Sequence, residues 1–151
     1  MRTLLMFLFL LPLWQSLETI SGKVVGVSDG DTIVVLLSDN RELRVRLEGI
    51  DCPEKKQEFG EKAKQATATL CWKKEVKIIK SGTDKYGRTL GFVYVDDLCV
   101  NEELLKMGLA WHYKKYNSDP HYSQLEKNAR DRKVGLWSQP DPEAPWDFRH
   151  K

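Results

Sequence analysis

The chain has 151 residues, which is enough for one domain with a hydrophobic core and too few for two domains of ordinary size. Hydrophobic residues make up 41% of it and charged residues 30%, a composition typical of a globular protein. The formal net charge of +2 is nearly neutral. Bulk charge therefore gives no argument for nucleic-acid binding, and any attraction to phosphate must come from local clusters of Lys and Arg.

The first sixteen residues, MRTLLMFLFLLPLWQS, differ from the rest of the chain. Arg2 precedes an uninterrupted apolar run from Leu4 to Trp14. This run has the length of a signal-peptide core, is too short to cross a bilayer as a helix, and lacks the polar face of a packed first helix. We expect a signal peptide cleaved near Ser16 and a secreted or periplasmic protein. An uncleaved, membrane-associated N-terminus is the alternative, because Trp14 is a poor residue two places before the cleavage site.

Five segments have the composition of β-strands, and the first three follow one another through short polar turns. In the third, ELRVRL, the apolar residues Leu43, Val45 and Leu47 alternate with Arg44 and Arg46. The apolar set should face a core, and both arginines should project from the opposite face. The expected strands are 20–27, 32–37, 42–47, 76–80 and 90–95.

Three helices are expected between and after these strands. The first covers 59–72, the second follows an Asn101 N-cap and ends at Gly108, and the third follows Asp119-Pro120 and runs to about Arg132. The remaining tail contains three prolines and two tryptophans in GLWSQPDPEAPWDFRHK, and we expect an ordered, extended strap.

These elements predict one α+β domain over 17–151, mainly a β-barrel, including an extended C-terminal tail over 138–151. A five-stranded OB-fold barrel with three helices is the architecture that fits best. A parallel α/β order is disfavoured, because the first three strands are joined by short turns.

The cysteines Cys52, Cys71 and Cys99 form an odd set. An exported chain with three cysteines permits at most one internal disulfide. If a pair forms, we expect Cys71 with Cys99; free buried cysteines are equally compatible with the sequence. No C-x-x-C spacing occurs, and the histidines are scattered, so a zinc site is disfavoured.

The turn SDGDT contains a second aspartate that a hairpin does not require. Asp-Gly between two strand-like runs is a strong hairpin signal, which accounts for Asp29 but not for Asp31. The start of strand two and the end of strand three lie at the same end of a meander, so Asp31 should approach Asp51 and Glu54 in IDCPE. Such carboxylates suit a hard cation such as Ca²⁺. Solvated turn residues are the simpler alternative.

Two arginines lie close to these carboxylates along the predicted hairpins. Arg46 precedes the acidic turn directly, and Arg88 lies in the polar turn TDKYGR. A guanidinium has a permanent charge and a fork of donors that matches phosphate oxygens. Both can stabilise the negative charge that develops in the transition state of phosphodiester hydrolysis. Arg44 is better explained as a surface residue.

Aromatic and basic side chains alternate in two segments. Lys85 and Tyr86 lie in DKYGR, and Trp111 and Tyr113 lie in WHYKKY. Aromatic rings beside cations are typical of single-stranded nucleic-acid binding. A packed aromatic edge is the alternative, and Trp111 could serve the core alone.

Five motifs stand in the order SDGDT, VRLEGIDCPE, TDKYGR, VNEELLKMGLAWHY and GLW. Together, from Ser21 to Trp137, they resemble the staphylococcal-nuclease-like (thermonuclease) family, and the ending PEAPWDFR is similar to tails of its exported bacterial members. The resemblance implies an OB-fold barrel with three helices and a Ca²⁺-dependent phosphodiesterase that acts on DNA and RNA.

The resemblance also implies roles for single residues, carried over position by position. Glu54 is the acidic residue that contacts the attacking water. The matching positions are Asp31, Asp51 and the backbone carbonyl of Cys52 for the metal, Arg46, Glu54 and Arg88 for catalysis, and Lys85, Tyr86, Trp111 and Tyr113 for the nucleotide pocket.

Three departures from the best-known member matter. Cys52 replaces a threonine, which keeps a backbone ligand and loses a hydroxyl. Trp111 replaces a stacking tyrosine, which keeps the stacking and loses a phenolic hydroxyl. The stretch between Glu54 and Phe59 is shorter than that member's basic loop, so substrate contacts there should be weaker or different.

The sequence therefore predicts a Ca²⁺-dependent nuclease of low sequence specificity that leaves 3′-phosphate products. We expect it to prefer single-stranded or locally melted DNA and RNA, and to act as a monomer without an obligate protein partner. Two alternatives remain open: a catalytically inactive nucleic-acid-binding OB-fold module, and an exported interaction domain in which SDGDT is only a hairpin.

Overall fold

The computed structural model describes residues 17–151, so the expected leader over residues 1–16 lies outside the described residues. The strands are β1 (Thr19–Asp29), β2 (Thr32–Leu36), β3 (Glu42–Leu47), β4 (Ile50–Asp51), β5 (Glu75–Thr83), β6 (Thr89–Val95), β7 (Leu98–Cys99) and β8 (Trp111–His112). The helices are α1 (Gly60–Cys71), α2 (Val100–Lys106), α3 (Pro120–Asp131), the 3-10 turn η1 (Gly135–Ser138) and α4 (Pro145–Phe148).

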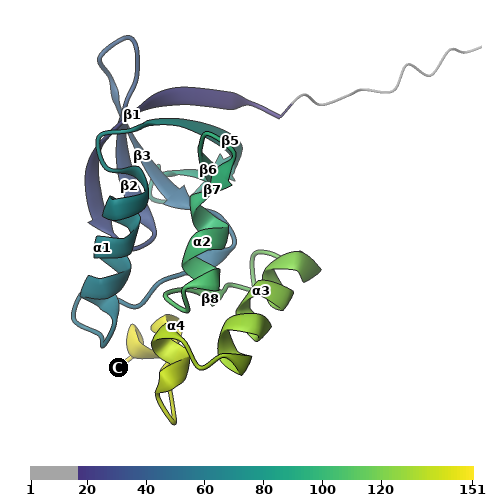
Figure 1. Ribbon diagram of the computed structural model, residues 1–151. Helices are drawn as coiled ribbons and strands as arrows, with labels where there is room; N and C mark the ends of the chain where they lie inside the picture. Colours follow the sequence, from purple (N-terminus) through teal and green to yellow (C-terminus); the bar gives the residue numbers. More distant parts are fainter. Residues whose placement is uncertain (1–16) are drawn as a thin grey trace, which may run out of the picture.

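Five of these strands close into a barrel. The main sheet has the order β3-β2-β1-β5-β6-β7, and a parallel pairing between β3 and β6 joins its two sides. The short strands β4 and β8 form a separate antiparallel pair. This mixed, closed barrel with helices confirms the predicted OB-fold architecture. The barrel strands lie at one end of the molecule, and β8, α3 and α4 lie at the other (Figure 1).

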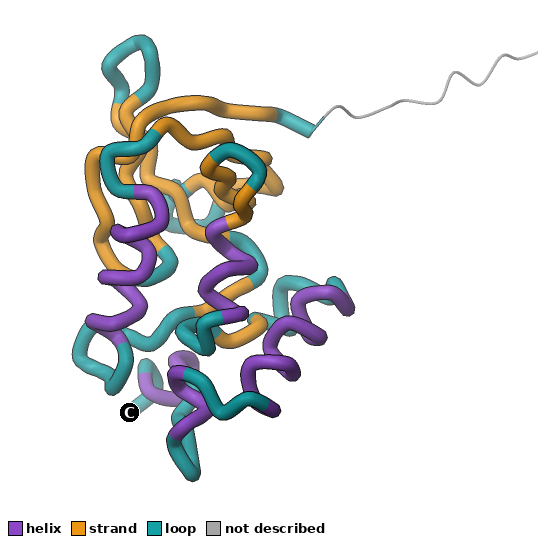
Figure 2. Tube along the Cα trace, viewed as in Figure 1, coloured by secondary structure: helices purple, strands orange, loops and turns teal. Residues whose placement is uncertain are grey.

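The core follows the alternation of the strands. Val24, Ile33, Val45 and Ile78 are fully buried inside the barrel. Helices α1 and α2 pack against β1 and β6 and extend from the barrel toward the C-terminal end of the molecule (Figure 2). Ala63 of α1 and Leu104 of α2 belong to the same buried cluster. Among residues 17–151, no helix combines the length and the apolar character needed to span a membrane.

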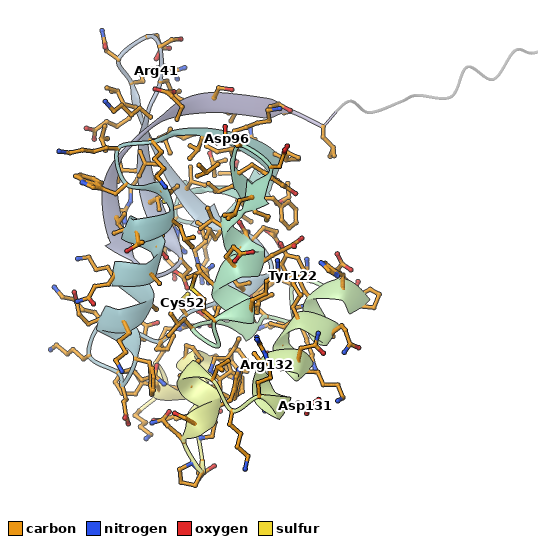
Figure 3. All side chains as sticks on the ribbon, viewed as in Figure 1. Arg41, Cys52, Asp96, Tyr122, Asp131 and Arg132 are labelled. Carbon is orange, nitrogen blue, oxygen red and sulfur yellow. The ribbon has the colours of Figure 1, made fainter. Side chains whose placement is uncertain are left out.

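The turn between β1 and β2 depends on a glycine for steric reasons. A Cβ built on Gly30 would lie 2.8 Å from the Cβ of Ala63 and 2.9 Å from the Sγ of Cys52. Both distances are far below van der Waals contact, so only glycine allows this turn to pack against α1. The interpretation of Gly30 as a turn residue is thus confirmed, with close packing as an added reason. Figure 3 shows the side chain of Cys52 beside α1.

Helix α2 begins earlier than the sequence indicated. Its N-cap is Cys99, and Asn101 lies inside the first turn, fully buried. The Asn101 amide accepts a hydrogen bond from the N–H of Val93 at 3.0 Å and donates to the carbonyl oxygens of Glu48 and Gly91. The prediction of an Asn101 cap was wrong, because the side chain satisfies sheet and loop backbone instead of its own helix.

The other helix signals are confirmed. Asp119 caps α3 by accepting a hydrogen bond from the N–H of His121 at 2.8 Å, and Pro120 is the first helical residue. Gly108 follows α2 with a φ of 67°, as a C-terminal glycine requires.

The C-terminal tail is ordered but not extended throughout, which corrects the expectation of an extended strap. It forms the turn η1 and the short helix α4, whose first residue is Pro145. Proline is well suited to a first helical position, since its fixed φ matches the helix and its missing N–H would have no partner there. The three cysteines, all buried within the described residues, are free rather than disulfide-bonded.

Candidate active site

The two predicted metal aspartates come from neighbouring ends of the hairpins. Thr32 of β2 pairs with Arg46 of β3, and the N–H of Leu47 donates to the carbonyl oxygen of Asp31 at 2.8 Å. The N–H of Cys52 then donates to Oδ2 of Asp31 at 2.8 Å. This places Asp31 beside the segment that carries Asp51, as the meander predicts.

Arg46 binds both aspartates at once. Its Nη2 lies 3.4 Å from Oδ2 of Asp31 and 3.2 Å from Oδ1 of Asp51. Its Nη1 donates to the carbonyl oxygens of Leu47 at 2.7 Å and Ile50 at 2.8 Å. The side chain is only 12% exposed. Arg46 therefore does not project freely from the strand as predicted, because it folds back and fixes the loop that carries Asp51.

Burial and the neighbouring charges shift the pKa values of the two aspartates in opposite directions. Burial opposes ionisation of Asp31, but the Arg46 guanidinium and hydrogen bonds from Asp29, Cys52 and Thr32 outweigh it and lower the pKa of Asp31. Burial raises the pKa of Asp51 despite its arginine partners. Of these two aspartates, Asp31 is therefore the one whose carboxylate stays ionised more readily.

Asp29 stabilises this turn through a hydrogen bond with the backbone of Asp31. Its Oδ1 accepts a hydrogen bond from the N–H of Asp31 at 3.3 Å. Burial, followed by repulsion from the Asp31 carboxylate, raises the pKa of Asp29 to about 7. A protonated Asp29 leaves Asp31 as the charged member of the pair.

Glu54 is connected to Asp51 by the side chain of Arg149, a residue that the sequence analysis did not identify. Nη1 of Arg149 lies 2.6 Å from Oε1 of Glu54 and 3.2 Å from Oδ1 of Asp51, and its Nη2 lies 2.8 Å from Oδ2 of Asp51. Hydrogen bonding to Asp51, and then to Glu54, raises the pKa of Arg149 despite some desolvation. The only sequence signal was a basic residue in an aromatic tail, which does not identify its partners.

The carboxylates of this cluster are the chemical type of ligand that a hard cation prefers. Asp31 and Asp51 are carboxylates held within reach of one guanidinium nitrogen, and Glu54 is linked to Asp51 through Arg149. Oxygen donors of this kind are the ligands that Ca²⁺ prefers. Within residues 17–151, however, no group of three His, Cys, Asp or Glu side chains is arranged as a metal site. The carboxylate of Asp51 is paired with Arg149 instead.

The second predicted arginine lies in a different local structure. Arg88 donates from Nε to Oδ2 of Asp84 at 2.7 Å, across the turn between β5 and β6, and its guanidinium lies 5.5 Å from the ring centre of Tyr86. Tyr86 is 72% exposed, and Nζ of Lys85 lies 5.1 Å from the same ring. Within residues 17–151, no ion pair joins Arg88 to Asp31 or Asp51. The parallel pairing of Arg46 with Leu90 nevertheless brings the strand that follows Arg88 alongside β3.

The remaining nucleotide-pocket residues line a cavity near the tail. Trp111 and Tyr113 face a cavity of about 590 Å³ together with Lys115, Arg130 and Trp146. The ring of Tyr113 stacks on that of Trp146, with centroids 5.3 Å apart and planes 5° apart. The lining thus combines aromatic and basic side chains, the groups typical of nucleotide binding, with the carboxylates of Glu126 and Asp147.

Trp111 also packs into a small second core, as the alternative interpretation allowed. Its ring lies 4.6 Å from that of Trp137, and the Arg130 guanidinium lies over both rings, at 4.9 Å from Trp111 and 3.7 Å from Trp137. Arg130 is itself paired with the buried Glu126. The role of Arg130 was not predicted, because nothing in the spacing links α3 to η1.

Comparison with known proteins agrees with this geometry. A family model described as staphylococcal nuclease homologue matches residues 44–139, more than half of the chain. An "uncharacterized endonuclease" of Haemophilus influenzae is 42% identical over 129 residues, covering 85% of this chain and 72% of that protein. "Micrococcal nuclease" of Shigella flexneri is 38% identical over 149 residues, covering 91% and 83%. "Protein ParB" of Escherichia coli is 42% identical over 151 residues, covering 93% and 83%. The chain therefore belongs to the staphylococcal nuclease family.

Proposed function

We propose that this protein is a Ca²⁺-dependent nuclease that hydrolyses phosphodiester bonds of DNA and RNA and leaves 3′-phosphate ends. The observation that carries the proposal is the contact of one guanidinium, that of Arg46, with both Asp31 and Asp51 at 3.4 and 3.2 Å. Family membership and the names of the relatives support nuclease activity.

Asp31, Asp51 and the backbone carbonyl of Cys52 would hold the cation. Bound there, it supplies positive charge that offsets the negative charge of the phosphodiester and of its transition state. Arg46 holds the two aspartates in place and keeps their charges balanced. Glu54 is the group that orients the attacking water or takes its proton.

The exposed turn between β5 and β6 would contact the substrate. Arg88 is partly exposed and held in one orientation by Asp84. Its fork of donors suits a phosphate oxygen, and Tyr86 and Lys85 beside it offer a ring and a charge to the nucleotide. Together with Trp111 and Tyr113, these contacts address phosphates and base faces rather than base edges, so sequence specificity should be low.

Incubation of plasmid DNA, single-stranded DNA and RNA with CaCl₂ or with a chelator tests this proposal. We expect cleavage of all three substrates with CaCl₂, fastest on single strands, and none with the chelator. The product ends should resist extension by a polymerase until a phosphatase removes the 3′-phosphate. Binding without cleavage would instead support an inactive nucleic-acid-binding module.

A further inference from the structure

The C-terminal segment over residues 145–151 brings a positive charge directly onto the acidic cluster. Arg149 follows α4 and contacts both oxygens of Asp51 and one oxygen of Glu54, at 2.6 to 3.2 Å. Bidentate pairing of this kind is the strongest form of guanidinium–carboxylate contact. Arg149 therefore neutralises the same side chains that would bind a cation and orient water.

Arg149 also covers these carboxylates. The side chain of Asp51 is 1% exposed, whereas that of Arg149 is 36% exposed. Because Arg149 is the outer partner and Asp51 the inner one, a cation that approaches from solvent meets the guanidinium first. Arg149 donates a hydrogen bond to each oxygen of Asp51 and holds its positive charge against them, so direct coordination of a cation by Asp51 would compete with Arg149.

The segment that carries Arg149 is attached mainly through side chains. Helix α4 has four residues, which is too short to be stable by itself. Trp146 stacks on Tyr113 and meets the ring of Trp111 edge-on, and the amide of Gln57 donates to the carbonyl oxygen of Glu143 at 2.7 Å. An element held in this way can detach locally without unfolding the barrel.

We propose that Arg149 is an active-site residue that serves as the internal counter-cation of Asp51 and Glu54, and that a divalent cation must displace it from Asp51 to bind. The inference rests on the proposed function, since it assumes that Asp31 and Asp51 are the cation ligands. Binding of the cation and docking of the segment are then negatively coupled, and the coupling is reciprocal.

The first test measures binding of CaCl₂ alone by calorimetry, with no nucleic acid present. Arg149→Gln should bind Ca²⁺ more tightly than the unmodified full chain by roughly tenfold or more, because a competing charge in direct contact with the ligands is removed. Lys151→Gln is the matched control: it removes one positive charge from the same segment, where Lys151 pairs with Glu143. It should change the affinity by less than about twofold, as expected for an exposed pair.

The second test follows the segment itself by hydrogen exchange of residues 144–151. In the unmodified chain, CaCl₂ should speed exchange of the α4 amides. In Arg149→Gln, exchange should already be fast and should not respond to CaCl₂. Equal Ca²⁺ affinities of Arg149→Gln and the unmodified chain would overturn the inference, as would slower exchange on adding CaCl₂. The inference would also be overturned if neither the unmodified chain nor Arg149→Gln bound Ca²⁺. The proposed nuclease activity is tested separately, by the DNA cleavage assay.

Discussion

Oδ2 of Asp31 accepts a hydrogen bond of 2.8 Å from the backbone N–H of Cys52, and this bond joins the first hairpin to the loop after β4. The two residues are 21 positions apart. The bond orients the Asp31 carboxylate and at the same time places Asp51, the residue before Cys52, beside it. Asp31 thus has a structural partner on one oxygen as well as its predicted role toward a cation.

Arg46→Ala should abolish cleavage and also weaken the fold. Removing the buried guanidinium leaves Asp31 without its ion-pair partner and frees the carbonyl oxygens of Leu47 and Ile50. Loss of one partner from a buried charge cluster costs about 3–5 kcal/mol of stability. Urea unfolding and a DNA cleavage assay measure the two effects.

Arg44→Ala is the control for this variant, because Arg44 lies on the same strand and is exposed. It should change stability by less than about 0.5 kcal/mol. If Arg46→Ala were as stable as Arg44→Ala, the contacts of Arg46 with the aspartates and the loop would not stabilise the fold.

Arg88→Ala should separate activity from stability. Arg88 is partly exposed and its ion pair is with Asp84 of the same turn, so the fold should lose less than about 1 kcal/mol. The cleavage rate should fall by about 10²–10³, the usual effect of losing one preorganised charge contact. Arg41→Ala, in the exposed hairpin at the far end of the barrel (Figure 3), is the control and should keep full activity. Full activity of Arg88→Ala would contradict the catalytic role proposed for Arg88.

Asn101→Ala should destabilise the protein by roughly 2–4 kcal/mol, since it leaves the buried N–H of Val93 and the carbonyl oxygen of Gly91 without their side-chain partner. Thermal or urea unfolding measures the loss. Asn128→Ala, at an exposed position of α3, should be nearly neutral. An equally small effect of both substitutions would show that the Asn101 hydrogen bonds contribute little.

The thiols should resist alkylation in the folded protein. All three cysteines are buried, and burial raises the pKa of Cys71 to about 11. The reactive thiolate is therefore rare at pH 8. Mass spectrometry should find almost no iodoacetamide label on the native protein and three labels after unfolding in urea without reductant. Only one label after unfolding would indicate a disulfide and contradict the free thiols.

Much of the barrel could be predicted because its strands carry local signals. The run ELRVRL has strict alternation, and the observed β3 has the predicted bounds. The turn chemistry of SDGDT correctly located the first hairpin, and Asp119-Pro120 correctly located the start of α3. From strand order alone, the approach of Asp31 to Asp51 also followed.

Long-range contacts between polar side chains could not be predicted. Asn101 is a residue type that often caps helices, yet its amide pairs with backbone from two other segments, β6 and the turn after β3. Arg46 was predicted to project from its strand toward a phosphate, yet its side chain turns back onto its own loop. Arg149 binds Asp51, which lies 98 positions earlier in the sequence, and spacing along the chain does not predict contacts at that separation. In each case tertiary geometry, rather than local preference, selects the partner.

The most direct test of the proposed site is the rate of single-stranded DNA cleavage by Asp31→Asn in CaCl₂. Asparagine has nearly the same shape and keeps an oxygen that can accept the N–H of Cys52, and Arg46 keeps its ion pair with Asp51, so the fold should persist with reduced stability. Asp39→Asn, in the exposed turn between β2 and β3, is the control. We predict that Asp31→Asn loses at least about 10² in rate while Asp39→Asn retains the unmodified rate. A folded Asp31→Asn protein with full activity would contradict a reaction centred on Asp31, Asp51 and Arg46.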